Sequence, residues 1–257
     1  MEASVVAGTS RGSATMLRTI LLACGVASSL LYVVMLVVAA MQYPGYSSMS
    51  RAVSELSAIG APSRPLWVAL GIVYGVLVIA FGWGIWREAR ANRALRIVGA
   101  LFVVNGVIGF AWPPMHPRGA AFTTTDLLHV GFTVVTLVFM MLSIGFGAAA
   151  FGRRFRLYSI GTLLVHLGFG ILTFTQGRSI AAGLETPWVG LTQRINIGVH
   201  LLWVAVLAVA VMRAGRSPVR ARRVDAPTPL PPGATPVDAR AIVTPSPTSS
   251  QAGVPRP

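Results

Sequence analysis

Six long apolar stretches follow one another along the chain, and short polar segments separate them. A helix that crosses a membrane needs about 20 mostly apolar residues. The stretches that approach this length are Ile20–Ala40, Leu66–Trp86, Ile97–Trp112, Leu127–Phe151, Leu157–Thr175 and Ile195–Met212. The pattern predicts an all-α fold, a polytopic bundle of six transmembrane helices over residues 17–212.

Polar and proline-rich segments lie on either side of this transmembrane domain. Residues 1–16 form a short N-terminal segment. Residues 213–257 hold ten of the seventeen prolines and five arginines close to the last apolar stretch. A segment of this composition cannot bury a core. We therefore expect a disordered Pro/Arg-rich tail after residue 212.

The first polar connection, residues 42–65, has a helical pattern of its own. Gly60 and Pro62 would end such a helix. Its apolar residues recur at helical spacing, at Met49, Ala52, Val53, Leu56 and Ile59. This predicts a short outer amphipathic helix with Glu55 on its polar side. The helix either covers the bundle as a lid or holds Glu55 over an outward-facing pocket.

The composition excludes several classes of protein. Hydrophobic residues make up 54% of the chain and charged residues 11%, whereas soluble domains average about 25% charged residues. A chain of this composition cannot cover a soluble surface with polar groups. We therefore exclude a soluble enzyme and a nucleic-acid-binding domain, and we expect membrane lipids as the main contacts.

The distribution of arginine predicts the orientation in the membrane. The chain has 21 basic residues, all of them arginine, and seven acids. Fourteen arginines lie in the N-terminal segment, the second and fourth connections and the start of the tail, and five lie in the other connections. Cytoplasmic loops carry the excess of positive charge. We expect a multi-pass plasma-membrane protein with both termini in the cytoplasm, and the use of arginine without lysine suggests a bacterial source.

Candidate chemistry gathers in the outward connections and at the adjoining helix ends. Asp126 and His129 share one face of the fourth predicted helix, and Asn196 and His200 share one face of the sixth. Polar residues inside a bilayer usually face the bundle interior. The candidate residues, for a polar network or for ligand binding, are Glu55, His116, Asp126, His129, Arg194, Asn196 and His200.

Three interpretations of these residues stay open. The first is a hydrogen-bonded network between helices, in which Asp126 and His129 meet Asn196, His200 or Arg194. The second is a zinc site of Asp126, His129 and His200, although no HExxH motif supports it. The third is a pocket in which Arg118 and Arg194 bind the phosphate of a lipid headgroup or small ligand. We expect no cofactor, and zinc is the alternative.

The sequence does not identify a reaction. We favour a non-enzymatic membrane protein with an outward-facing polar cavity for a lipid headgroup or a small ligand. One alternative is a membrane-embedded metal-dependent hydrolase that uses Asp126, His129 and His200. Another is a scaffold that acts through its cytoplasmic tail. A homo-oligomer, or a protein partner that binds the tail, is compatible with either non-enzymatic role.

Several motifs of the outward connections resemble a bacterial integral-membrane family, domain of unknown function 998. They are Tyr43-Pro-Gly-Tyr46, Ser54-Glu-Leu56, Gly60-Ala-Pro62, Pro113-Pro-Met-His-Pro117, the pair Asp126 and His129, and Arg194-Ile-Asn196. The resemblance covers about residues 17–212 and implies six spans with no assigned function. The six-span topology is also similar to that of the eukaryotic DRAM/Sfk group.

Overall fold

The computed structural model describes residues 2–215, with side chains from residue 12 onward. The tail predicted at residues 213–257 lies outside the described residues after residue 215. The helices are α1 (Glu2–Met41), the 3-10 helix η1 (Val53–Ser57), α2 (Arg64–Glu88), α3 (Arg93–Phe110), α4 (Thr124–Ala150), α5 (Arg153–Thr175), α6 (Gly177–Ala181) and α7 (Val189–Ala214).

The six predicted spans are confirmed as helices. Six helices of the described chain are long and apolar enough to cross a membrane. The third predicted span extends to Trp112, but α3 ends at Phe110. Pro113 and Pro114 follow directly, and a residue before proline is disfavoured in helical conformation. The next span begins at Thr124, where Thr123 and Asp126 form a capping box.

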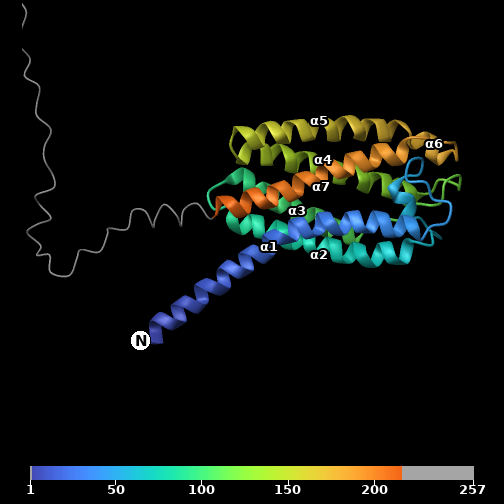
Figure 1. Ribbon diagram of the computed structural model, residues 1–257. Helices are drawn as coiled ribbons and strands as arrows, with labels where there is room; N and C mark the ends of the chain where they lie inside the picture. The colour runs from blue at the N-terminus through green and yellow to red at the C-terminus, as the bar shows by residue number, and fades with distance from the viewer. Residues whose placement is uncertain (1, 216–257) are drawn as a thin grey trace, which may run out of the picture. The chain divides into compact units, whose positions relative to one another are not determined.

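The long helices run side by side (Figure 1), and their contacts close a ring. Helix α1 packs against α2 and α7, and the ring continues through α3, α4 and α5 back to α7. Helices that are not neighbours in the ring, such as α4 and α7, make few contacts. A ring of six helices therefore leaves its centre to be filled by side chains.

The ring has two different ends. The connections 42–63, 111–123 and 182–188 gather at one end, which we call the loop end. The short connections 89–92 and 151–152 lie at the other, together with the end of α7 at Ala214; we call this the terminal end. We call the two halves of the ring, by the same names, the loop half and the terminal half.

The terminal half has a closely packed centre. The Trp203 side chain is fully buried there, and its Nε1 donates a hydrogen bond to Oγ of Ser159 at 2.9 Å. Gly147 of α4 makes room for this indole, because a Cβ at that position would lie 2.5 Å from the ring. Phe81 and Phe102 meet edge to face with ring centroids 5.1 Å apart. These bulky rings fill the interior across the ring of helices.

An ion pair closes the terminal end. Arg18 on α1 meets Glu88 on α2, with Nε and Oε2 separated by 2.8 Å. The same guanidinium donates to the carbonyls of Val211 and Met212 on α7. Arg18 thereby links three helices and satisfies carbonyls at the end of a helix, where the backbone has no partner of its own.

The outer helix predicted between Met49 and Ile59 is much shorter in the structure. Only Val53–Ser57 is helical, as a 3-10 turn. It is buried beneath the loop surface and contacts α1, α2 and α7. The segment therefore covers the end of the bundle. The predicted polar side was wrong for Glu55, which is 2% exposed.

Candidate functional site

Arg118 joins three connections at the loop end. Its Nε donates to Oε1 of Glu55 at 2.8 Å. Its Nη1 donates to the carbonyl of Leu184 at 2.9 Å and to Oγ1 of Thr186 at 2.8 Å. Its Nη2 donates to the carbonyl of Ser50 at 3.3 Å. Four of the five guanidinium N–H groups are therefore used inside the protein.

Arg194 ties the first connection to the start of α7. Its Nη1 donates to the carbonyls of Ser48 and Gly190 at 2.8 and 3.1 Å. Its Nη2 donates to the hydroxyl of Tyr46 at 2.9 Å. Burial raises the pKa of the Tyr46 phenol, and the bond from Arg194 opposes that rise. Arg118 and Arg194 thus spend most of their donors on the protein, so binding phosphate would break these bonds.

The Asp126 carboxylate is enclosed by its own connection. Oδ1 accepts from the backbone N–H of His116 at 2.7 Å. Oδ2 lies 2.9 Å from Nδ1 of His116 and accepts from the backbone N–H and the hydroxyl of Thr123, each at 2.9 Å. These bonds fix connection 111–123 against the beginning of α4. They also leave Asp126 little capacity for a further partner.

His129 is held one turn further along α4. Its Nδ1 donates to the carbonyl of Pro113 at 2.7 Å, because a carbonyl can only accept. The Trp112 indole packs edge to face on the imidazole, with ring centroids 5.6 Å apart. The other ring nitrogen, Nε2, makes no hydrogen bond among the described residues and is free for a ligand.

A second polar group lies deeper, between α5 and α7. The amide of Asn196 donates to the carbonyl of His166, and Nδ1 of His166 donates back to the carbonyl of Asn196 at 3.1 Å. The ring of His200 lies 5.9 Å from that of His166 and stacks beside Trp203. The side chain of His200 makes no hydrogen bond with any described residue.

The hydrogen-bonded network that we predict from Asp126, His129, Asn196 and His200 does not form as one unit. The four side chains do not bond to one another within the described chain. The reason is the ring: α4 carries the first pair and α7 the second, and these helices make few contacts. Each pair therefore finds its partners among its nearer neighbours.

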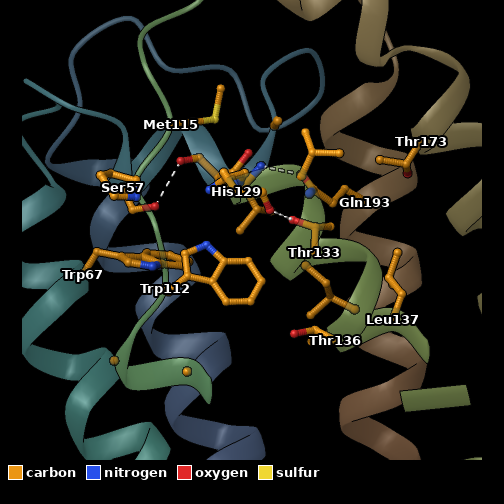
Figure 2. A pocket seen from close by; sticks show the side chains of 18 of the residues that line it. Ser57, Trp67, Trp112, Met115, His129, Thr133, Thr136, Leu137, Thr173 and Gln193 are labelled. Carbon is orange, nitrogen blue, oxygen red and sulfur yellow. Dashed lines mark hydrogen bonds between the residues drawn. The ribbon is translucent and has the colours of Figure 1, made fainter. Parts of the chain in front are cut away.

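A cavity of about 750 Å³ separates these groups. It reaches from connection 111–123 down to His200, in the loop half of the ring. Figure 2 shows Thr133, Thr136 and Leu137 along its α4 wall, with Trp67 and Trp112 across from them. The α7 wall presents Gln193, Asn196 and His200, the same residues that share one helix face in the sequence.

The described structure does not group three or more His, Cys, Asp or Glu side chains around one point where a metal could bind. His129 and His200 line the same cavity from two different helices, α4 and α7. Asp126 also borders it but directs both oxygens to His116 and Thr123. The zinc site stays a prediction and would need these side chains to rearrange.

Sequence reasoning missed several cavity residues. Asn105 of α3, Thr136 of α4, and Tyr32 and Tyr74 of α1 and α2 all line the cavity. The sequence could have identified Asn105 as an inward-facing residue, because an amide within an apolar span usually faces the interior of the bundle. The other three residues are common on lipid-facing surfaces as well, so their position in the sequence does not distinguish them.

Comparison with known proteins identifies the family. No curated protein and no solved structure matches the chain. The family model described as "Protein of unknown function (DUF998)" matches residues 26–210. This range includes the connections at the loop end, the cavity walls and the packed centre of the terminal half. Because the match covers well over half of the 257 residues, the chain belongs to the DUF998 family.

Proposed function

We propose that this protein is a non-enzymatic membrane protein that takes up one amphipathic small molecule or lipid in the cavity of its loop half. The cavity carries the proposal. Its volume of about 750 Å³ falls within the range of about 300–1,000 Å³ that is usual for ligand pockets. Such pockets are lined mainly by apolar side chains, together with a few polar groups that orient the ligand. The lining of this cavity has the same composition.

The walls favour a molecule that is largely apolar. Val78, Leu137 and Met140 line the cavity together with Trp67 and Trp112. Polar groups lie along α7 and near connection 111–123, and also at Asn105 of α3 and at Thr133 and Thr136 of α4. A ligand with an apolar body can pack against the first set, while its polar groups meet the second. Fixed connections at the loop end then keep the cavity formed when it is empty.

We further propose that the loop end faces outward and that both termini are cytoplasmic. The fourteen-to-five division of arginines between the two sides supports this orientation. The plasma membrane is the proposed location. Under this arrangement the cavity receives its ligand from the outer leaflet or from outside the cell.

Filling the cavity tests the binding proposal. Thr136→Phe adds a ring to the cavity wall, whereas Val135→Phe adds the same ring at an adjacent, exposed position on α4. Native mass spectrometry of each protein, purified in mild detergent, measures the retained small molecules. We expect wild type and Val135→Phe to retain a bound species that Thr136→Phe loses. Equal retention in both variants, or none in the wild type, contradicts the proposal.

Cysteine labelling tests the orientation. Ala121 in connection 111–123 and Ala91 in connection 89–92 are both exposed. Each is replaced by cysteine in a Cys24→Ala background, and intact cells are treated with an impermeant maleimide. We expect Ala121→Cys to be labelled and Ala91→Cys to be labelled only after the membrane is opened. The reverse pattern places the termini outside and overturns the orientation.

A further inference from the structure

Two buried polar atoms at the deep end of the cavity have no partner. Five buried side-chain atoms of the described residues make no hydrogen bond, and two of them are Oδ1 of Asn105 and Nδ1 of His200. Both side chains line the cavity. Buried polar groups in proteins are nearly always hydrogen-bonded, and each exception calls for an explanation. A ligand or water at this point would supply the missing partner.

The two side chains lie around the same aromatic ring. Phe102 of α3 is 6.4 Å from His200, measured between ring centroids. Asn105 is three residues beyond Phe102, on the same face of α3. Trp203 stacks on His200 with ring centroids 6.2 Å apart. Asn105 and His200 therefore border the floor of the cavity, where the packed centre of the terminal half begins.

Asn196 adds a third group with a defined orientation. Its amide nitrogen donates to the carbonyl of His166, and this bond fixes which end of the amide is the oxygen. Asn196 is 5% exposed and lines the cavity one turn above His200. Its Oδ1 makes no hydrogen bond in the described structure. The deep cavity thus offers amide oxygens, which can only accept.

Building on the proposed function, we propose that the floor of the cavity binds the hydroxyl group of an uncharged, lipid-like alcohol. A hydroxyl donates one hydrogen bond and accepts others. It can donate to the free amide oxygen of Asn105 or Asn196 and accept from an N–H of His200. A ketone, ester or ether oxygen cannot donate, so it leaves the amide oxygens unpaired.

Charge and wall chemistry exclude two other ligand classes. An ammonium group also donates, but the floor holds no carboxylate to balance it; Asp126 lies higher and is already bonded to His116 and Thr123. A carboxylate ligand would need a cation at the floor, and none of the described arginines lines that part. The hydroxyls of Tyr32 and Tyr74 on the wall can either donate or accept a hydrogen bond. They therefore do not favour a charged ligand over an alcohol.

Competition between matched probes tests the proposal. Purified full-length protein is loaded with tritiated dodecanol, which unlabelled dodecanol, dodecyl methyl ether or dodecanoic acid then displaces. The ether has nearly the same chain but lacks the donor, and the acid carries a charge. We expect dodecanol to displace the label at concentrations about tenfold or more below those of the other two, because each lost hydrogen bond weakens binding.

Two variants link this preference to the floor. Asn105→Leu and His200→Phe remove the polar atoms without removing any hydrogen bond that the described chain makes. In both we expect the preference for dodecanol over the ether to fall to about onefold. Gln42→Leu makes the same amide-to-leucine change at an exposed position outside the cavity and should keep the preference.

The outcomes separate this proposal from the proposed function. Equal displacement by alcohol and ether in the wild type overturns the hydroxyl site and leaves water as the partner of Asn105 and His200. Absence of saturable dodecanol binding also overturns it, and the proposed function still stands if native mass spectrometry finds a species that Thr136→Phe excludes. If no such species is found, the proposed function fails as well.

Discussion

The terminal half and the loop half of the ring are built from the same helices, yet their centres differ. In the terminal half, the fully buried Trp203 and Phe81 belong to one apolar cluster that includes residues of α1, α2, α3, α4 and α7. In the loop half, the side chains line a cavity of about 750 Å³ and leave it open. The difference shows that the helix arrangement does not by itself decide whether the centre is solid or hollow.

A single face of α7 shows where the change occurs. Asn196 and His200 are buried on this face in the loop half, and Trp203, Leu207 and Val211 continue it in the terminal half. The spacing of three or four residues is unbroken. Polar side chains border the cavity and bulky apolar ones fill the centre. The polarity of an inward helix face therefore marks the hollow part of this bundle.

The two halves also differ in what joins the helices. The terminal half relies on contact between helix backbones, as at Gly82 and Gly99, where a Cβ at Gly82 would lie 2.7 Å from the carbonyl oxygen of Gly99. The loop half relies on long polar side chains, of which Arg118 and Arg194 make the most bonds. The loop half thus depends mainly on polar side chains, whereas in the terminal half Arg18 adds such bonds to the close packing of the helices.

Truncation of the central tryptophan should have the largest effect. Trp203→Ala removes the fully buried indole and leaves a void, and we expect a loss of about 3–5 kcal/mol in the free energy of unfolding. Leu137→Ala, on the wall of the existing cavity, should cost clearly less because few contacts are lost there. Unfolding by SDS titration in mixed micelles measures both. Equal losses would mean that the two halves are packed alike.

Removal of Arg118, which joins the three connections of the loop end, should have the second largest effect on stability. Arg118→Ala leaves Glu55, only 2% exposed, with no cation nearer than Arg51, whose Nη1 lies 4.0 Å from Oε2, and breaking a buried ion pair from one side costs about 3–5 kcal/mol. Because Arg118 is partly exposed, we expect the lower end of this range, by the same unfolding measurement. Adding Glu55→Leu should recover part of the loss. If the double variant is as unstable as the sum of the two single ones, the pair does not act as a unit.

Much of the fold could be predicted from the sequence. The lengths of the apolar stretches predict the six spans. The proline pair after Trp112 explains why α3 ends before the predicted end of the third span. The outer helix was predicted too long, because apolar spacing between Met49 and Ile59 arises equally from a coil that is packed over the bundle. Glu55 was placed on the polar side because its partner, Arg118, is distant in the sequence.

Of the candidate residues, His116, Asp126, His129, Asn196 and His200 line the cavity, whereas Glu55 and Arg194 do not. Gln193, Asn196 and His200 do share one wall, because helical periodicity decides which residues lie on one face. The partners of Asp126 and His129 depend on the ring order of the helices, and no sequence pattern of a single chain gives that order. The two groups consequently looked like one network.

Substitution of the two cavity histidines should have the smallest effects, and they should differ. His129→Ala removes the hydrogen bond to the carbonyl of Pro113, and bonds of this kind in membrane proteins are worth about 0.6 kcal/mol on average and at most about 1.7. His200→Phe removes no hydrogen bond of the described chain and retains an aromatic ring beside Phe102 and Trp203. We expect it to be neutral or slightly stabilising in the absence of ligand, since replacing an unpaired buried polar group by an apolar one is often favourable.

The combination of the two substitutions distinguishes separate groups from one network. His129 and His200 share no hydrogen-bond partner, so the effects of His129→Ala and His200→Phe on the free energy of unfolding should add to within about 0.5 kcal/mol. Thermal unfolding of the two single variants and the double variant, each freed of lipid by extensive detergent washing, measures this. A deviation from additivity above that limit would show that the histidines are coupled across the cavity, through a bound molecule or through water. The loop half would then be bridged at its centre, as the terminal half is by Trp203.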